Sequence, residues 1–347
     1  MVCGCISSRI FAAAALLLLA GQLSPSSVVD HAAEQANAEA TRAIEAGHLI
    51  DAVAQLQGAL RRFPDNHPLQ FNLGLALVRL GSLSQAIDPL RKAAADPALA
   101  GEAHYLLGVD YFENKQYAPA ITELSGPLTA GSRERVLYML EESYRHTGRV
   151  NEAEATFHDL FTHYPDSAWT HYLMGAAYED QREPDKAQEE YKRAAQIDPT
   201  LPNIDFSIGY IYFRQGDIGE AQQWLGKEAS EGCHSLANFY LGEIARGNGE
   251  SQKAEALYHR ALTCDASNVD AHLRLGMLFE TEKRYPLAIA QFRQAIRVKP
   301  NIAPAHYHLA SVYRALGRKA DSEAEFAKVR KIQAERDNSV DVTKEKQ

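Results

Sequence analysis

The chain has few cysteines, few glycines and prolines, and no excess of basic residues. Four cysteines in 347 residues exclude a disulfide-dense scaffold or a multi-cysteine zinc protein. Glycine and proline, with 22 and 14 residues, are too rare for a low-complexity chain. The 36 basic and 45 acidic residues give a net charge of -9, which disfavours nonspecific binding of nucleic acid or anionic lipid. An apolar content of 46% indicates an ordinary globular composition.

Catalytic and metal-binding motifs are also missing. The sequence contains no GxxxxGK[ST], HExxH, GxSxG or GxGxxG. Its thirteen histidines include no helical HxxxH pair and no Cys/His cluster. We therefore predict a protein that is not an enzyme and that carries no cofactor and no metal ion.

One short apolar run lies near the N-terminus. Arg9 precedes IFAAAALLLLA at residues 10–20, and a Ser/Pro stretch follows. The run is shorter than the roughly 20 residues of a membrane span, so we predict a signal peptide at residues 1–24 and a short linker at 25–32. A large residue precedes both candidate cleavage points at the -3 position, so an uncleaved anchor at residues 10–23 stays open. We expect an exported protein, periplasmic or secreted, or one anchored to the membrane by that segment.

Internal periodicity dominates the rest of the chain. A series of mostly small residues advances in steps of 33 or 34, and a large apolar residue stands sixteen positions after each member. The first series is Ala40, Gly74, Gly108, Glu141, Gly175, Gly209, Gly242, Gly276 and Ala310. The second series is Leu56, Leu90, Leu124, Phe157, Tyr191, Leu225, Tyr258, Phe292 and Phe326. Two series that keep a constant spacing of sixteen residues over nine units indicate a repeat architecture.

This pattern resembles the tetratricopeptide repeat family, whose unit is a helix–turn–helix of about 34 residues. The fifth repeat carries the family pattern most fully, at Trp169, Leu173, Gly175, Tyr178, Ala187, Tyr191, Ala194 and Pro199. The resemblance implies an all-α fold, a right-handed superhelical α-solenoid of about nine units. We number each repeat so that the first series above falls at position 8.

The predicted array spans residues 33–336 and is followed by a flexible polar tail at 337–347. The array leaves no room for a separate catalytic domain. Position 15 is glycine in six repeats, and we expect the first helix to end there in the left-handed conformation. The repeats are 33–66, 67–100, 101–133, 134–167, 168–201, 202–234, 235–268, 269–302 and 303–336.

The resemblance assigns positions 2, 5, 9 and 12 to a concave groove lined by the first helices. Aromatic residues fill position 5 in seven of the eight repeats from the second onward, either for packing or as a binding ladder. Position 12 carries charges of alternating sign. Our candidate partner-binding residues are Tyr138, Arg145, Trp169, Tyr172, Phe206, Tyr210, Phe213 and Phe239.

These features predict a non-catalytic scaffold that mediates protein–protein interaction or complex assembly in an exported compartment. Its partner would be a peptide or a protein domain held in the groove, and we expect no nucleic-acid partner. The alternative is a carbohydrate-binding module, because aromatic ladders also stack against sugars. A membrane partner is expected only if the N-terminal apolar segment stays uncleaved.

Two local features give further predictions. Cys233 and Cys264 end successive repeats, at an expected spacing of about 10 Å. A disulfide needs Cα atoms within about 7 Å, which the irregular segment 230–234 could provide, and two separate buried thiols are the alternative. Pro127 would cost about 3 kcal/mol inside a helix. The second helix of the third repeat should therefore end between Leu124 and Gly126.

Overall fold

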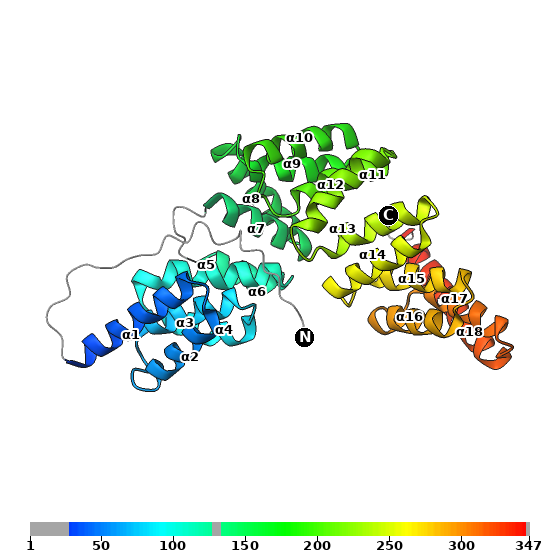
Figure 1. Ribbon diagram of the computed structural model, residues 1–347. Coiled ribbons are helices and arrows are strands. Elements are labelled where there is room, and N and C mark those ends of the chain that lie inside the picture. The colour runs from blue at the N-terminus through cyan, green and yellow to red at the C-terminus, as the bar shows by residue number, and fades with distance from the viewer. Residues whose placement is uncertain (1–27, 127–132, 345–347) are drawn as a thin grey trace. The chain divides into compact units, whose positions relative to one another are not determined.

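The computed structural model describes residues 28–126 and 133–344 (Figure 1). These residues form eighteen α-helices, and no strand occurs among them. The chain divides into two compact units, Met1–Pro202 (unit 1) and Asn203–Gln347 (unit 2). The predicted signal peptide, residues 1–24, lies outside the described residues. The prediction of an all-α fold is confirmed.

Unit 1 is built from ten helices that pack in consecutive pairs. The first helix of each pair also contacts the first helix of the next pair, which gives the row expected of a helical solenoid. The helices are α1 Val28–Glu45, α2 Leu49–Leu60, α3 His67–Arg79, α4 Leu83–Ala93, α5 Pro97–Glu113, α6 Tyr117–Leu124, α7 Arg133–His146, α8 Val150–His163, α9 Ala168–Asp180 and α10 Pro184–Ile197.

Unit 2 continues the same helix–turn–helix pattern. Among the described helices of both units, none is long and apolar enough to cross a membrane. The helices of unit 2 are α11 Ile204–Gln215, α12 Ile218–Ser230, α13 Ser235–Gly247, α14 Ser251–Cys264, α15 Val269–Thr281, α16 Tyr285–Val298, α17 Ala303–Ala315 and α18 Lys319–Lys344.

The small residue at position 8 lets the two helices of a pair come close together. A Cβ atom on Gly74 would lie 2.4 Å from the Leu90 side chain, and one on Gly276 would lie 2.5 Å from the Phe292 ring. Real Cβ atoms do not approach other atoms so closely, so glycine is required by the packing. The large residue of the second series fills the space and is fully buried, as with Leu90 and Phe292.

Position 15 adopts a left-handed backbone conformation in all nine predicted repeats. Six of these positions are the glycines seen in the sequence, with φ between 71° and 84°. The other three are Lys115, Arg182 and Lys283, with φ of 58°, 61° and 58°. The turn geometry is therefore imposed by the helix–turn–helix unit, because non-glycine residues adopt it despite its steric cost.

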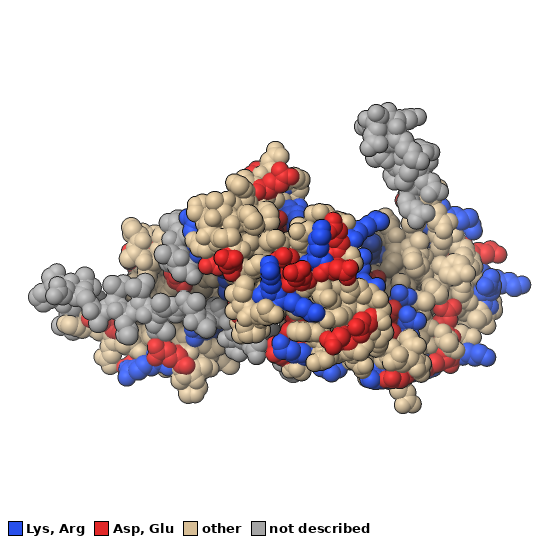
Figure 2. Space-filling model, turned by 90° about the horizontal axis from the view of Figure 1, so that it is seen from above, with Lys and Arg blue, Asp and Glu red and all other residues tan. Residues whose placement is uncertain are grey.

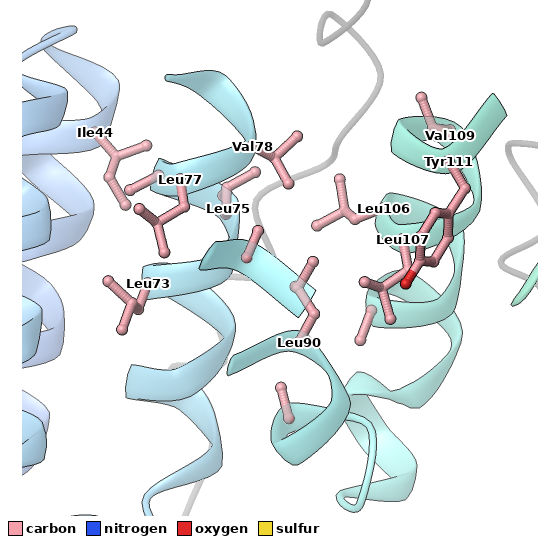
Figure 3. Close-up of a cluster of buried hydrophobic side chains, with 14 of the residues drawn as sticks. Ile44, Leu73, Leu75, Leu77, Val78, Leu90, Leu106, Leu107, Val109 and Tyr111 are labelled. Atoms are coloured by element: carbon pink, nitrogen blue, oxygen red, sulfur yellow. The ribbon is translucent and has the colours of Figure 1, made fainter. Parts of the chain in front are cut away.

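The buried apolar side chains of unit 1 form separate clusters along its helices. One cluster extends from Ala33 to Leu140. Figure 3 shows part of it, with Leu90 of α4 between α3 and α5, and with Val78 of α3 facing Leu106 of α5. Each helix pair thus buries its apolar face against the next pair, which explains why a single repeat could not fold alone.

The third and fourth repeats depart from the pattern. Helix α6 ends at Leu124, within the range from Leu124 to Gly126 that was predicted from Pro127. Pro127 itself lies outside the described residues. In the fourth repeat, Glu141 takes the place of the small residue at position 8. Its partner Phe157 is only partly buried, whereas Leu90, Tyr191 and the other members of that series up to Phe292 are buried.

Candidate binding face on the first helices

Four aromatic rings follow one another across three first helices of unit 1. Phe112 of α5 meets the edge of Tyr138 on α7 at 5.8 Å between ring centroids. Tyr138 stacks on Trp169 of α9 at 4.4 Å and meets Tyr172 edge-on at 5.7 Å. We call these four residues the aromatic chain of unit 1. It occupies positions 2, 5 and 12, which the sequence assigned to the groove.

Both ends of this chain connect to polar groups. Tyr117 contacts Phe112 at 6.1 Å and stacks on the imidazole of His146 at 4.3 Å. At the other end, Tyr172 lies 5.5 Å from the ring of Tyr191, whose hydroxyl donates a hydrogen bond to Glu179 at 3.2 Å. The aromatic chain is therefore flanked by the imidazole of His146 at one end and the carboxyl group of Glu179 at the other.

Glu142 and its neighbours carry most of the charge beside the aromatic chain. Glu142 pairs with Arg145 one turn later on α7 and lies 3.3 Å from His146. Arg135, at the start of α7, lies 3.8 Å from Glu113 at the end of α5. Burial holds the pKa of Tyr138 well above its usual range, and Tyr172 and the carboxylates of Glu142, Glu113 and Glu141 add to this shift.

Two buried carboxyl groups in unit 1 have an oxygen without a hydrogen-bond partner. Glu141 on α7 is 8% exposed, and its Oε2 has no partner. Burial, together with the charge of Glu142, raises the pKa of Glu141 to about 7, while Arg145 opposes the shift. Asp110 on α5 is 6% exposed and lacks a partner at Oδ2, and burial raises its pKa to about 6. Such groups cost free energy unless something else compensates for them.

Unit 2 has an aromatic cluster of its own, centred on Tyr240 of α13. The ring centroid of Tyr240 lies 5.0 Å from that of Tyr210 and 5.1 Å from that of Phe213, both on α11. Phe206 also contacts both tyrosines. Tyr240 is not among the candidate residues predicted from the sequence, because it stands at position 6, outside the positions assigned to the groove. Its central role was visible only as a large aromatic next to Phe239 in the sequence.

The charged groups of unit 2 are more fully compensated. Glu243 of α13 pairs with Arg246 through two hydrogen bonds of 3.1 Å and accepts another from the Tyr258 hydroxyl. Arg274 of the next first helix, α15, lies 3.3 Å from the same carboxylate. His308 of α17 similarly lies 2.7 Å from Glu280 of α15. Residues at position 6 thus reach back to an acid of the preceding repeat.

The candidate residues fall into the two units. Tyr138, Arg145, Trp169 and Tyr172 come together in unit 1. Phe206, Tyr210 and Phe213 come together in unit 2. Phe239 is 7% exposed and belongs to the core around Tyr258, so we correct its assignment from a contact residue to a packing residue.

The histidines at position 4 connect the two helices of a repeat. His171 Nδ1 donates to Glu190 at 2.6 Å, and His104 makes the same contact with Glu123 at 2.9 Å. Both ring nitrogens of His306 are within hydrogen-bond distance of acceptors, Glu325 and the carbonyl of Pro300. These histidines therefore hold the two helices of a repeat together. A spacing of 19 residues between His and Glu was a signal that sequence analysis could have used.

Cys233 and Cys264 form a disulfide with a Cα–Cα distance of 5.1 Å. The expected spacing of about 10 Å was wrong, because it assumed equivalent places on two helices. Cys264 ends α14, whereas Cys233 lies beyond the end of α12 at Ser230, in the linker to α13. That linker brings the two cysteines within bonding distance.

The described residues contain no group of three or more His, Cys, Asp or Glu side chains that could hold a metal ion. Figure 2 shows acidic and basic side chains next to one another over the face in view.

Sequence comparison identifies the family. A tetratricopeptide repeat model matches residues 37–100, 206–271, 241–301 and 273–337, and a second model of the same name matches 168–201. These matches cover more than half of the chain, which therefore belongs to the tetratricopeptide repeat family. Residues 101–167, which include Glu141, lie outside these matches. The number of repeats, nine, stays a prediction.

Two curated proteins are similar to parts of the chain. Superkiller complex protein 3 of Mus musculus is 27% identical over 132 residues, which are 36% of this chain and 8% of that protein. The UDP-N-acetylglucosamine–peptide N-acetylglucosaminyltransferase SPINDLY of Arabidopsis thaliana is 28% identical over 102 residues, 29% of this chain and 11% of that protein. The chain spans about a tenth of the length of either relative.

Among solved structures, the human IFIT1 dimer with m7Gppp-AAAA is similar in fold. Its TM-score is 0.50 at 16% sequence identity, over 87% of this chain and 72% of that one. At this identity the likeness shows the fold alone. The family and the fold together define a repeat scaffold of a kind that mediates protein–protein interaction and is typically non-catalytic.

Proposed function

We propose that the protein is a scaffold that binds an extended segment of a partner protein along its first helices. The observation that carries this proposal is the stack of Trp169 on Tyr138, on two neighbouring first helices of unit 1. Trp169 stands at position 2 and is only partly buried, and it packs against the cluster of Leu137, Leu160 and Leu173. Large, rigid aromatic residues of this kind are typical anchors of protein interfaces.

A peptide segment fits this arrangement better than a sugar. Stacking on a sugar requires an open ring face, and one face of Trp169 is already covered by Tyr138 at 4.4 Å. The neighbouring Glu142, Arg145 and Glu179 offer charge and hydrogen bonds that suit backbone amides and charged side chains. We therefore prefer a protein partner to the carbohydrate alternative.

We also propose that the protein carries out no catalysis of its own. The repeats account for residues 33–336, and the catalytic motifs considered above are missing from the sequence. The match to SPINDLY covers only 11% of that protein, so the transferase activity in its name is not carried over to this chain. The net charge of -9 likewise argues against an RNA ligand of the kind named for IFIT1.

We infer that the protein works in an exported compartment. The apolar run at residues 10–20 after Arg9 is of the length of a signal sequence. The disulfide between Cys233 and Cys264 supports this location, because disulfides persist mainly in oxidising environments. An anchored form, held by residues 10–23, would place the repeats in the same compartment.

The test compares affinity with stability in three variants. Peptides selected for binding from a random library would be titrated against Trp169→Ala, Tyr210→Ala and the packing control Tyr111→Ala, which removes a side chain that is 6% exposed. We expect the first two variants to lose about 1–2 kcal/mol of affinity and little thermal stability. Tyr111→Ala should lose stability by about 3 kcal/mol or more. Unchanged affinity in both Trp169→Ala and Tyr210→Ala would contradict the proposed site.

A further inference from the structure

The aromatic chain of unit 1 lies among more acidic than basic groups. Arg135 and Arg145 are the basic side chains paired beside it, with Glu113 and Glu142 respectively. Four carboxyl groups lie near the same rings and outnumber these two guanidinium groups, and the imidazole of His146 lies 3.3 Å from Glu142. The acids are Glu113, Glu141, Glu142 and Glu179. Asp180 lies near Glu141.

One of these acids is buried and incompletely bonded. Glu141 is 8% exposed, and its Oε2 accepts no hydrogen bond. It lies close enough to Glu142, Arg145 and Asp180 to interact with their charges. Buried carboxylates of this kind are normally paired with a cation. The surplus of acid and the unbonded oxygen together mean that a positive group would be stabilised here.

Unit 2 shows what a cation does at the equivalent place. Glu243 and Glu142 both stand at position 9, and both pair with an arginine three residues later. In unit 2 the next repeat adds Arg274 at position 6, whose Nε lies 3.3 Å from Glu243. In unit 1 the residue at that position is Leu173, which is buried and apolar. Glu142 in unit 1 therefore has no arginine at position 6 of the next repeat, whereas Glu243 in unit 2 has Arg274 there.

We propose that unit 1 binds a basic segment of the partner, and that a Lys or Arg side chain of this segment contacts Glu142 and the rings of Tyr138 and Trp169. This inference rests on the proposed function and specifies its partner. The Lys or Arg side chain of the partner would neutralise Glu142, as Arg274 neutralises Glu243 in unit 2. The charge surplus also steers basic segments to this face.

The first experiment is a selection of peptides from a random displayed library on the full, folded chain. We expect the enriched sequences to carry more Lys and Arg than the starting library, and their binding to weaken as NaCl is raised. Enriched sequences that are neutral or acidic would overturn the basic partner but keep segment binding. A selection without any enriched sequence family would count against the proposed function itself.

The second experiment tests whether the carboxylate of Glu142 contacts the basic side chain of the peptide. We expect Glu142→Gln to weaken a selected basic peptide about tenfold, and a matched peptide with its Lys replaced by Met to be unaffected by the same change. Glu189→Gln, on α10 in the same unit, removes one equally charged but exposed acid and should leave affinity within about twofold. Equal affinities for unchanged chain, Glu142→Gln and Glu189→Gln would overturn the proposal.

A further variant guards against a folding defect. Glu141→Gln keeps the shape of a buried side chain and removes its charge, so the fold should be retained. It should weaken the basic peptide while the thermal unfolding temperature stays the same or rises. A variant that unfolds at the same temperature and binds the basic peptide equally well would show that Glu141 adds nothing to the site.

Discussion

Glu142 in unit 1 and Glu243 in unit 2 occupy the same position in their repeats but have different surroundings. Glu243 is held by Arg246, Arg274 and the hydroxyl of Tyr258. Glu142 has Arg145 and His146, and next to it stands a second buried acid, Glu141. In unit 2, basic side chains of the same unit neutralise the charge of Glu243. In unit 1, acidic groups outnumber basic groups around Glu142.

The difference has a structural cause at position 8. In unit 2 this position is Gly242, where a Cβ atom would lie 2.6 Å from the Tyr258 ring. In unit 1 it is Glu141, and the facing Phe157 is only partly buried. Tight packing and charge balance are thus found together in unit 2, and both are relaxed in the fourth repeat. Residues retained at such a cost to stability are often found at functional sites.

The largest difference in stability between the two units should come from breaking the disulfide, which lies in unit 2. Cys233→Ser opens a link between residues separated by 31 positions and should cost about 3–4 kcal/mol of unit 2 stability. Unit 1 should keep its stability. Hydrogen exchange measured helix by helix, on this variant and on the unchanged chain with and without reductant, would show the loss in α12 to α15. Equal losses in both units would show that the two do not unfold separately.

Opposite substitutions at position 8 should have opposite effects. Gly242→Ala should destabilise unit 2 by about 2–3 kcal/mol, because the new methyl group meets the Tyr258 ring. Glu141→Ala should stabilise unit 1 by about 1 kcal/mol at pH 8, because it removes a buried carboxylate that lacks a full set of partners. Denaturant melts of both variants provide the measurement. Destabilisation by Glu141→Ala would mean that this carboxylate is already compensated within the fold.

The pH dependence should differ between the units. Burial raises the pKa of Glu141 from 4.5 to about 7. Below pH 4.5 the carboxyl is protonated whether folded or unfolded. As the pH rises from 4.5 through 7, the unfolded chain loses its proton first, so unit 1 should lose about 2 kcal/mol. Denaturant melts at pH 5 and pH 8 would measure this, and Glu141→Gln should remove most of the change. The same loss in the Gln variant would assign it to other groups, such as Asp110.

The smallest effects concern the left-handed turns at position 15. Lys283→Gly should stabilise unit 2 by about 1 kcal/mol, because glycine adopts a φ of 58° without steric cost. Gly148→Ala should destabilise unit 1 by a similar amount, since its φ is 73° and no side chain would contact a new Cβ. Thermal unfolding of the two variants gives both values. Changes of the same sign would show that backbone strain does not govern these turns.

Repetition is the reason that so much of the fold could be predicted. The glycines at position 15 predicted left-handed turns, which the structure confirms. The glycines at position 8 recur in the same register and allow close helix packing. The same register implied the left-handed turns at Lys115, Arg182 and Lys283, although glycine alone was used as the signal. The end of α6 followed from Pro127 by local stereochemistry.

The candidate site was predictable only in part. Position assignments placed Tyr138, Trp169 and Tyr172 together, because these positions repeat along the chain. The burial of Phe239 and the central place of Tyr240 depend on how neighbouring repeats pack, which one sequence does not reveal. The unbonded oxygen of Glu141 and the distance between the two cysteines likewise depend on the exact course of the chain.

The most direct test of the account is a hydrogen-exchange footprint of a selected basic peptide on the full chain. We predict slower exchange in α7 and α9, around Tyr138 and Trp169, with less change in α13 and α15, where Arg274 already occupies the place of a ligand cation. At a peptide concentration near the Kd of the unchanged chain, the footprint should be much weaker with Glu142→Gln. Protection confined to the second helices, or to α13 and α15 without α7 and α9, would contradict the account.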